Sequence, residues 1–176
     1  MSKMFGRRRG RARLAATGFF VAGLVLALDQ ITKHIILRVV DLDAGGPGSQ
    51  IRVLDPVFNL TMVWNRGVSF GLLAADSLWQ RLLLAGFSLL IAGVLTAWLT
   101  KAERWLQAVA FGLVIGGAIG NVIDRLVYGA VADFLDFSGL YFPYVFNVAD
   151  AGISIGVALL VLDLLLDNGR PQSRPL

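Results

Sequence analysis

Four stretches of this chain are long and apolar enough to cross a lipid bilayer as helices. They cover residues 14–40, with Asp29 and Gln30 inside the stretch, then residues 82–99, 105–126 and 144–166. A helix needs ~20 mostly apolar residues to cross ~30 Å of hydrocarbon. Charged residues make up only 16% of the chain, against roughly 25% in soluble domains. The sequence therefore predicts an all-α membrane protein with four transmembrane helices.

The first apolar run follows a basic segment, an arrangement that cleavable signal peptides share. No clear small-x-small cleavage site follows the run, and its apolar character resumes beyond Asp29. We therefore expect it to be retained as a membrane helix. The domain organisation that we expect is a basic tail over residues 1–13, one membrane domain over residues 14–166, and a short tail over residues 167–176.

The distribution of Lys and Arg predicts how the helices are oriented, because cytoplasmic loops carry an excess of both residues. Basic residues gather in the N-terminal tail, in the connection near residue 103 and in the C-terminal tail: Lys3, Arg7, Arg8, Arg9, Arg11, Arg13, Lys101, Arg104, Arg170 and Arg174. The longer segment 41–76 holds only Arg52 and Arg66. We expect a multi-pass protein with both termini cytoplasmic and with segments 41–76 and 128–143 on the outer side.

The composition also limits the chemistry that is available. The chain has no cysteine, which excludes disulfides, thiolate metal sites and a cysteine nucleophile, and its only histidine is His34. We expect no metal and no cofactor. The net charge of +4 comes with a basic run beside an apolar segment, which is typical of an anchor facing anionic lipid. Because aromatic and basic residues do not interleave, we expect no nucleic-acid binding.

Segment 41–76 is too polar to cross the membrane and too apolar to be a simple linker. Residues 41–50 are rich in Gly and Pro and predict turns. Beyond Pro56, apolar residues alternate with mostly polar ones at Phe58, Leu60, Met62 and Trp64. A period of two is typical of a strand with one buried face. We expect a small extracytoplasmic β-sheet between the first and second helices, lying on the membrane surface.

Several polar residues lie within or beside the apolar runs, where a charge costs about 2.5–3.5 kcal/mol on insertion scales. Asp29 and Lys33 are four residues apart, so they share a helical face and can pair, although a direct role at a site is also open. Arg125 fits either an interfacial anchor or a group that holds a carboxylate or carbonyl. Gly112, Gly116 and Gly120 recur every four residues and predict close helix contact.

Asp133 and Asp150 are the strongest catalytic candidates. Asp133 lies in a short β-like stretch after the third helix, and we expect Asp150 about two turns into the fourth. The predicted topology brings both to the same membrane face. Two carboxylates that share one proton can activate a water, the ionised one as base and the protonated one as acid. Spacing alone also permits a loop cap at Asp133 and a buried polar residue at Asp150.

Five motifs, in this order along the chain, resemble the lipoprotein signal peptidase family, also called signal peptidase II. They are residues 29–33 (DQITK), 65–70 (NRGVSF), 116–125 (GGAIGNVIDR), 131–134 (VADF) and 146–150 (FNVAD). Each motif alone is weak, but all five in order against four helices are specific. Ser69 departs from the family pattern, which more often has Ala at this position.

The resemblance implies a bacterial inner-membrane aspartyl endopeptidase that acts at the outer face. Its expected substrate is a prolipoprotein with diacylglycerol on the Cys that follows the signal peptide, and cleavage would fall just before that Cys. Its expected partners are this substrate and membrane lipid, and we expect a monomer. Asp133 and Asp150 match the catalytic positions. The positions that line or brace the site are matched by Asn65, Asn121, Arg125 and Asn147, with mainly structural roles implied for Asp29, Lys33 and Gly67.

Three other functions fit parts of the pattern. A membrane serine protease would use Ser69 and Lys33 as its dyad. A small transporter would use intramembrane carboxylates as a proton path, but it would spread them through the depth of the membrane. The acidic residues here gather toward one face, which favours surface chemistry. A purely structural subunit would leave Asp133 and Asp150 without a role.

Overall fold

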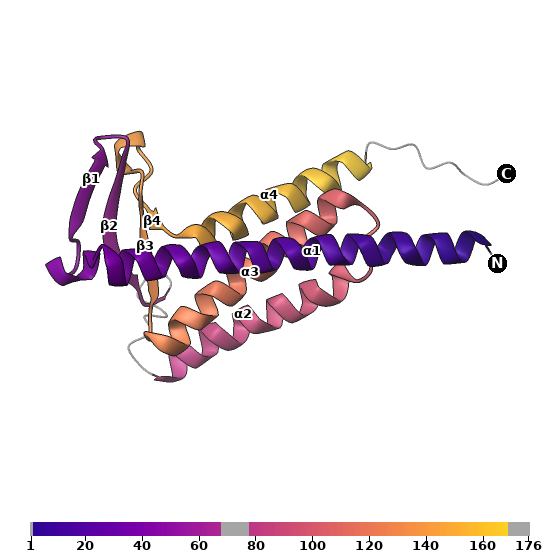
Figure 1. The fold of residues 1–176 in the computed structure, drawn as a ribbon, viewed down its shortest axis with the longest axis horizontal. Coiled ribbons are helices and arrows are strands. Elements are labelled where there is room, and N and C mark those ends of the chain that lie inside the picture. The colour runs from indigo at the N-terminus through magenta and orange to yellow at the C-terminus, as the bar shows by residue number, and fades with distance from the viewer. Residues whose placement is uncertain (1, 68–77, 169–176) are drawn as a thin grey trace.

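The structure is a computed structural model that describes residues 2–67 and 78–168 and combines a helical bundle with a small sheet at one end (Figure 1). The four long helices are α1 (Ser2–His34), α2 (Leu78–Leu99), α3 (Trp105–Val127) and α4 (Val148–Asn168). Each contains a stretch with the length and apolarity needed to cross a membrane. The predicted fold class is confirmed, although α1 also runs through most of the basic segment that was predicted as a separate tail.

Helix α3 lies at the centre of the bundle. In its most apolar stretch 67% of the residues are buried, against 22% in each of the other three helices. The glycines predicted to allow close contact do so. A Cβ at Gly116 would collide with the backbone carbonyl of Ala22 in α1, and one at Gly117 would collide with that of Ala149 in α4. Because these glycines have no side chains, α1 and α4 can approach the α3 backbone closely. Close packing of this kind is expected in a bilayer, where the hydrophobic effect does not drive helices together.

The sheet has four antiparallel strands in the order β1 (Gln50–Leu54), β2 (Phe58–Asn65), β3 (Val131–Asp136) and β4 (Val145–Phe146). The predicted strand at residues 58–65 is confirmed. The sheet is not confined to the segment between the first two helices, however, because β3 and β4 come from the connection between α3 and α4. Trp64 in β2 pairs with Ala132 in β3, so the α1–α2 and α3–α4 connections join into one sheet.

The sheet rests on the end of the first helix. After His34 the helix continues as a π-helical turn over Ile35–Val39 and then a short 3₁₀ helix over Leu42–Gly45. One buried apolar cluster joins these turns to β2 and β3: Ile36, Leu37, Leu42, Met62, Ala132 and Phe134. Burial of this cluster fixes the position of β3, and with it Asp133, relative to α1.

The fourth helix begins later than predicted, at Val148 rather than near Tyr144. The residues before it pair with β3 instead, Val145 with Asp136 and Phe146 with Leu135. Asn147 then caps the helix, since its Oδ1 accepts the backbone N–H of Asp150 at 2.8 Å. Asp150 therefore lies in the first turn of α4 and not two turns into it, as the sequence suggested.

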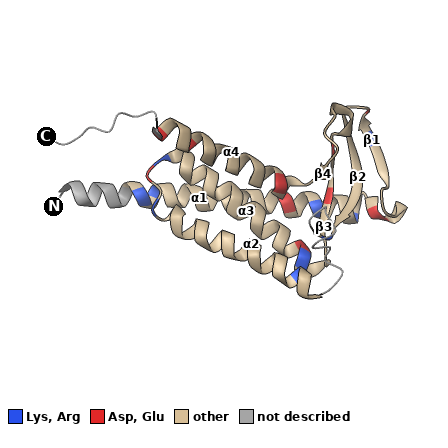
Figure 2. Cartoon of the chain, turned by 180° about the vertical axis from the view of Figure 1, so that it is seen from behind, with Lys and Arg blue, Asp and Glu red and all other residues tan. Residues whose placement is uncertain are grey.

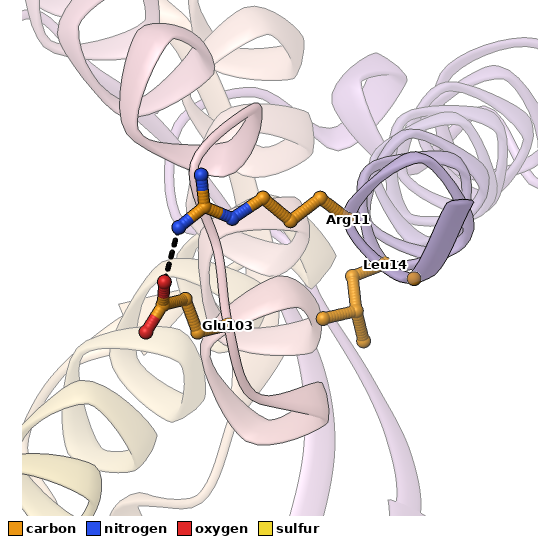
Figure 3. Close-up of a pocket in the computed structure, with 4 residues that line it drawn as sticks. Arg11, Leu14 and Glu103 are labelled. Carbon is orange, nitrogen blue, oxygen red and sulfur yellow. Dashed lines mark hydrogen bonds and ion pairs between the residues drawn. The ribbon is translucent and has the colours of Figure 1, made fainter. Parts of the chain in front are cut away.

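The start of α1, the end of α4 and the α2–α3 connection lie at the end of the bundle opposite the sheet, which we call the terminal end (Figure 1). Charged residues gather toward these two ends and leave the middle of the helices largely free of charge (Figure 2). At the terminal end Arg11 of α1 donates to Glu103, beside a hollow of about 280 Å³ that Leu14 also lines (Figure 3). Arg104 forms an ion pair with Asp163 at 2.9 Å, which connects the start of α3 to α4.

Candidate active site

The two candidate catalytic aspartates come from different elements at the sheet end of the bundle. Asp133 is in β3 and is 2% exposed, whereas Asp150 is half-buried in the first turn of α4. Each carboxylate accepts a hydrogen bond from an asparagine. Asn147 Nδ2 donates to Asp133 Oδ1 at 2.7 Å, and Asn121 Nδ2 donates to Asp150 Oδ1 at 2.7 Å.

The two asparagines are also bonded to each other. Asn147 Nδ2 donates to Asn121 Oδ1 at 3.2 Å, so the side chains form one chain from Asp133 through Asn147 and Asn121 to Asp150. Both asparagines are buried, and the network leaves their amide groups one consistent orientation. The structure thus brings together two carboxylates and two amides whose sequence positions span residues 121–150, as the predicted site requires.

Asn65 completes the surroundings of Asp133 from strand β2. Its Nδ2 donates to Asp133 Oδ2 at 3.1 Å, while its Oδ1 accepts the backbone N–H of Gly67 at 3.1 Å. Gly67 has a φ of +147°, a backbone conformation that residues other than glycine rarely adopt. Gly67 therefore contacts Asn65 through its backbone, and its structural role stays a prediction.

Burial and the nearby negative charge of Asp150 raise the pKa of Asp133 to about 7. Hydrogen bonds from Asn65 and Asn147 and the positive charge of Lys33 lower the pKa of Asp133, but they do not outweigh these two causes. Asp133 is thus protonated in a substantial fraction of molecules near neutral pH. A carboxyl group that can hold a proton near neutral pH, linked to a second carboxyl group through two amides, is an arrangement that general acid–base catalysis can use.

Arg125 is half-buried one helical turn after Asn121. Its Nη1 donates to the backbone carbonyl of Asn121 at 3.4 Å, and its charge attracts the carboxylates of Asp150 and Asp133. The two roles left open by the sequence were an interfacial anchor and a group that holds a carbonyl or carboxylate. The structure favours the second.

Beneath the aspartates lies a buried charged cluster formed by Asp29, Lys33 and Asp124. Lys33 Nζ is 2.8 Å from Asp29 Oδ2 and 2.7 Å from Asp124 Oδ2, and all three side chains are 3% exposed or less. The predicted pairing of Asp29 with Lys33 is confirmed. The part played by Asp124 was missed, although it lies one helical turn after Asn121 and so shares its face. Gln30 was missed too, and its Nε2 donates to both carboxylates of the cluster.

The charged cluster accepts hydrogen bonds from the backbone next to both aspartates. Asp124 Oδ2 accepts the backbone N–H of Ala132 at 3.1 Å, and Asp29 Oδ1 accepts that of Ala149 at 3.0 Å. Ala132 precedes Asp133 and Ala149 precedes Asp150. One cluster therefore fixes both elements that present a candidate catalytic carboxylate. Lys33 also reaches Asn121 Oδ1 at 3.4 Å, so the cluster touches the amide chain directly.

An apolar groove leads from Asp150 along the outside of α4. Its volume is about 280 Å³, and it lies between three aromatic rings of the β3–α4 connection and three small or apolar residues of the helix: Phe142, Tyr144, Phe146, Ala151, Ser154 and Ile155. Phe142 contacts Phe146 edge-on, with ring centroids 5.8 Å apart. Ile155 is 54% exposed. The groove thus runs from an exposed apolar residue of α4 to a candidate catalytic carboxylate.

The structure also bears on a serine–lysine dyad and on a metal site as alternatives to the paired aspartates. Lys33, which a serine–lysine dyad would use as its base, instead contacts the carboxylates of Asp29 and Asp124. Ser69, its proposed partner, lies outside the described residues. Within residues 2–67 and 78–168, no three His, Asp or Glu side chains gather in a way that would hold a metal ion.

Comparisons with known proteins agree with this architecture. The model of the signal peptidase (SPase) II family matches residues 21–166. A lipoprotein signal peptidase of Caulobacter vibrioides is 54% identical over 151 residues, which cover 85% of this chain and 87% of that protein. A lipoprotein signal peptidase of a Methylobacterium species is 44% identical over 87% of this chain and 91% of that protein.

Among solved structures, a bacterial membrane enzyme superposes with a TM-score of 0.77 at 29% identity, and the match covers 92% of this chain and 94% of the enzyme. The family match includes α3, β3 and the start of α4, on which the paired aspartates and their asparagines lie. The chain therefore belongs to the signal peptidase II family of bacterial membrane peptidases.

Proposed function

We propose that this protein is an aspartyl endopeptidase that removes the signal peptide from diacylglyceryl-modified prolipoproteins, cutting just before the lipidated Cys. The names of its relatives support the substrate class. The observation that carries the catalytic type is the chain of hydrogen bonds that joins Asp133 and Asp150 through two asparagines. Such a pair needs neither a serine nucleophile nor a metal to activate water.

In this mechanism Asp150 is the general base and Asp133 the general acid. Asp150 takes a proton from a water molecule as its oxygen attacks the carbonyl carbon of the scissile peptide, and Asp133 donates its proton to the carbonyl oxygen. As the tetrahedral intermediate collapses, one of its two hydroxyl groups returns a proton to Asp133, the C–N bond breaks, and the proton held by Asp150 passes to the departing nitrogen of the Cys. The raised pKa of Asp133, about 7, supports its role as the acid.

The apolar groove beside Asp150 supports a substrate anchored in lipid. Its aromatic wall and the exposed Ile155 offer apolar contacts that begin at the proposed base and continue toward the bilayer. A lipid attached to the Cys would hold the neighbouring peptide bond close to both aspartates. Each buried CH₂ contributes roughly 0.8 kcal/mol, and correct positioning of the scissile bond contributes to the rate as well.

Removal of the lipid from the substrate should therefore slow cleavage. We expect kcat/KM for an unlipidated prolipoprotein to be at least about 100-fold below that for the diacylglyceryl form. A small misplacement of the reacting groups alone lowers the rate by this factor. The measurement is cleavage by the purified protein in detergent. A matched control substrate carries the same lipid at the start of the signal peptide. It is equally anchored but wrongly placed, and it should also be cut slowly. Equal rates for all three substrates would contradict the proposed substrate.

We further propose that both termini are cytoplasmic and that the aspartates face the outer side, since the basic residues concentrate at the terminal end. A reporter that is active only outside the cytoplasm should give a signal when inserted at Gly48 or at Tyr141, which is 99% exposed. The same reporter at Glu103 in the α2–α3 connection should be silent. A signal at Glu103 would reverse the orientation and place the site on the wrong side for its substrate.

A further inference from the structure

A polar pocket lies at the sheet end and shares no lining residue with the apolar groove beside Asp150. It has a volume of about 270 Å³, and the side chains with polar or aromatic groups that line it are Arg38, Asp41, Asp43, Trp64 and Tyr128. They come from the turns after α1, from the end of β2 and from the residue that follows α3. Neither the family match nor the proposed reaction gives this pocket a role.

Two residues that line the pocket lie at the ends of membrane-crossing stretches. Arg38 is the penultimate residue of the first stretch, Gly10–Val39, and Tyr128 directly follows the third, Trp105–Val127. This is the depth at which lipid headgroups meet the protein, and Trp and Tyr are enriched there because one end of each ring system is apolar and the other polar. Trp64 and Tyr128 lie with ring centroids 5.7 Å apart.

The pocket presents both signs of charge. Within the described part of the chain no ion pair joins Arg38, Asp41 or Asp43 to another residue. Asp43 is oriented by Trp64, whose Nε1 donates to Asp43 Oδ1 at 2.9 Å. A guanidinium fork matches the geometry of a phosphate, while carboxylates beside aromatic faces favour an ammonium group. The ligand that fits all these groups carries a phosphate and an ammonium a few bonds apart.

Apolar side chains continue from the pocket into the membrane-crossing region. Ile35 and Val39 flank Arg38 and are 43% and 71% exposed, and Val127 beside Tyr128 is 65% exposed. A soluble ligand would gain nothing from these surfaces, whereas acyl chains would lie along them. The pocket volume is slightly below the roughly 300 Å³ at which pockets begin to enclose a drug-sized molecule. It suits a headgroup whose chains extend into the bilayer.

We propose that this pocket binds the headgroup of phosphatidylethanolamine, with the phosphate at Arg38 and the primary ammonium at Asp41 and Asp43. The two carboxylates disfavour an anionic lipid such as phosphatidylglycerol, which has no ammonium to balance them. They also favour an ammonium with N–H donors over the trimethylated one of phosphatidylcholine. The bound lipid would hold the β1–β2 side of the sheet against the membrane. This inference requires membrane insertion only and is independent of the catalytic proposal.

The test measures lipid retention by native mass spectrometry of the full-length protein released from detergent. Phosphatidylethanolamine should bind wild type at least about tenfold more tightly than phosphatidylglycerol or phosphatidylcholine, a difference of about 1.4 kcal/mol. Arg38→Gln and Asp41→Asn should each weaken this binding by about tenfold. Asparagine is chosen at position 41 because it tolerates the left-handed φ of +52° found there. Arg52→Gln on β1 is the control, and it should bind lipid like wild type.

Three outcomes would overturn the proposal. Equal retention of the three lipids by wild type would contradict the proposed lipid specificity. Unchanged retention of phosphatidylethanolamine by Arg38→Gln would show that the lipid does not bind at this pocket. Free phosphoethanolamine that competes as well as the intact lipid would show a soluble ligand instead. Thermal melting of each variant ensures that a loss of binding is not a loss of folding. Arg38 is exposed at the pocket, so its substitution should leave the melting temperature unchanged.

Discussion

Asp133→Asn and Asp150→Asn should each lower kcat for prolipoprotein cleavage by about 10²–10⁴-fold, the range expected when a general acid or base is removed. Both changes keep the size of the side chain and remove its ability to exchange a proton. If the two residues act as one unit, the double variant should be little slower than either single variant, because effects within a catalytic unit are strongly non-additive. The measurement is turnover of a diacylglyceryl prolipoprotein by purified protein.

Asp136→Asn is the matched control for this experiment. Asp136 lies in the same strand and is also buried, but it accepts bonds from Thr61 and Gln50 rather than from the amide chain. It should keep near-normal turnover. A variant of Asp133 or Asp150 that folds correctly and cleaves at the wild-type rate would contradict the aspartyl mechanism. Loss of activity in all three variants would point to general damage to β3 instead.

The pH dependence of wild-type cleavage follows from the same pair. Because burial and Asp150 raise the pKa of Asp133 to about 7, Asp133 loses its proton as the pH rises through that value. The rate should therefore fall on the alkaline side of about pH 7, where no acid remains. The apparent value belongs to the pair and not to one residue. In Asp136→Asn the profile should be unchanged.

Lys33→Met should destabilise the protein more than any surface substitution. The change leaves Asp29 and Asp124 buried, 0% exposed, without the ammonium group that lies within 2.8 Å of both. Removing one member of a buried ion pair costs roughly 3–5 kcal/mol. We expect a large drop in melting temperature in detergent together with loss of cleavage, since the cluster holds the amides of Ala132 and Ala149.

Lys101→Met provides the control, because Lys101 is exposed in the α2–α3 connection. Its melting temperature should stay close to that of wild type. A second-site change tests the cause. Adding Asp124→Asn to Lys33→Met removes one of the two uncompensated charges, so the double variant should be more stable than the sum of the single effects predicts. A melting temperature of Lys33→Met equal to wild type would show that the cluster carries no stabilising ion pair.

Much of the fold follows from local sequence patterns. Apolar length predicted all four helices, and the alternation after Pro56 predicted β2. The glycine spacing predicted close helix contact along α3, and the structure shows that contact with α1. These signals are strong because each depends on neighbours along the chain. The pairing of β2 with β3 could not be predicted in this way, since it joins residues that lie far apart in sequence.

The family motifs predicted more of the candidate site than residue spacing and helix geometry did. Spacing placed Asp29 and Lys33 on one face, and that pairing is confirmed. The late start of α4 was missed, although Asn147 is a favoured N-cap residue and signalled it. The contact of Asp124 with Lys33 required the crossing of α1 and α3, which no local pattern gives. The catalytic roles of Asp133 and Asp150 stay predictions.

The spacing of Asp29 and Lys33 also bears on how the chain enters the membrane during synthesis. The first helix reaches the bilayer before α3 exists, and each lone charge would cost about 2.5–3.5 kcal/mol there. Because these two residues are four apart on one helix, they neutralise each other without any later segment. Asp124 joins them once α3 has been made, and Ala149 binds last. The nascent chain therefore assembles the proposed peptidase site only when its fourth helix is in place, so we expect an unfinished chain to be inactive.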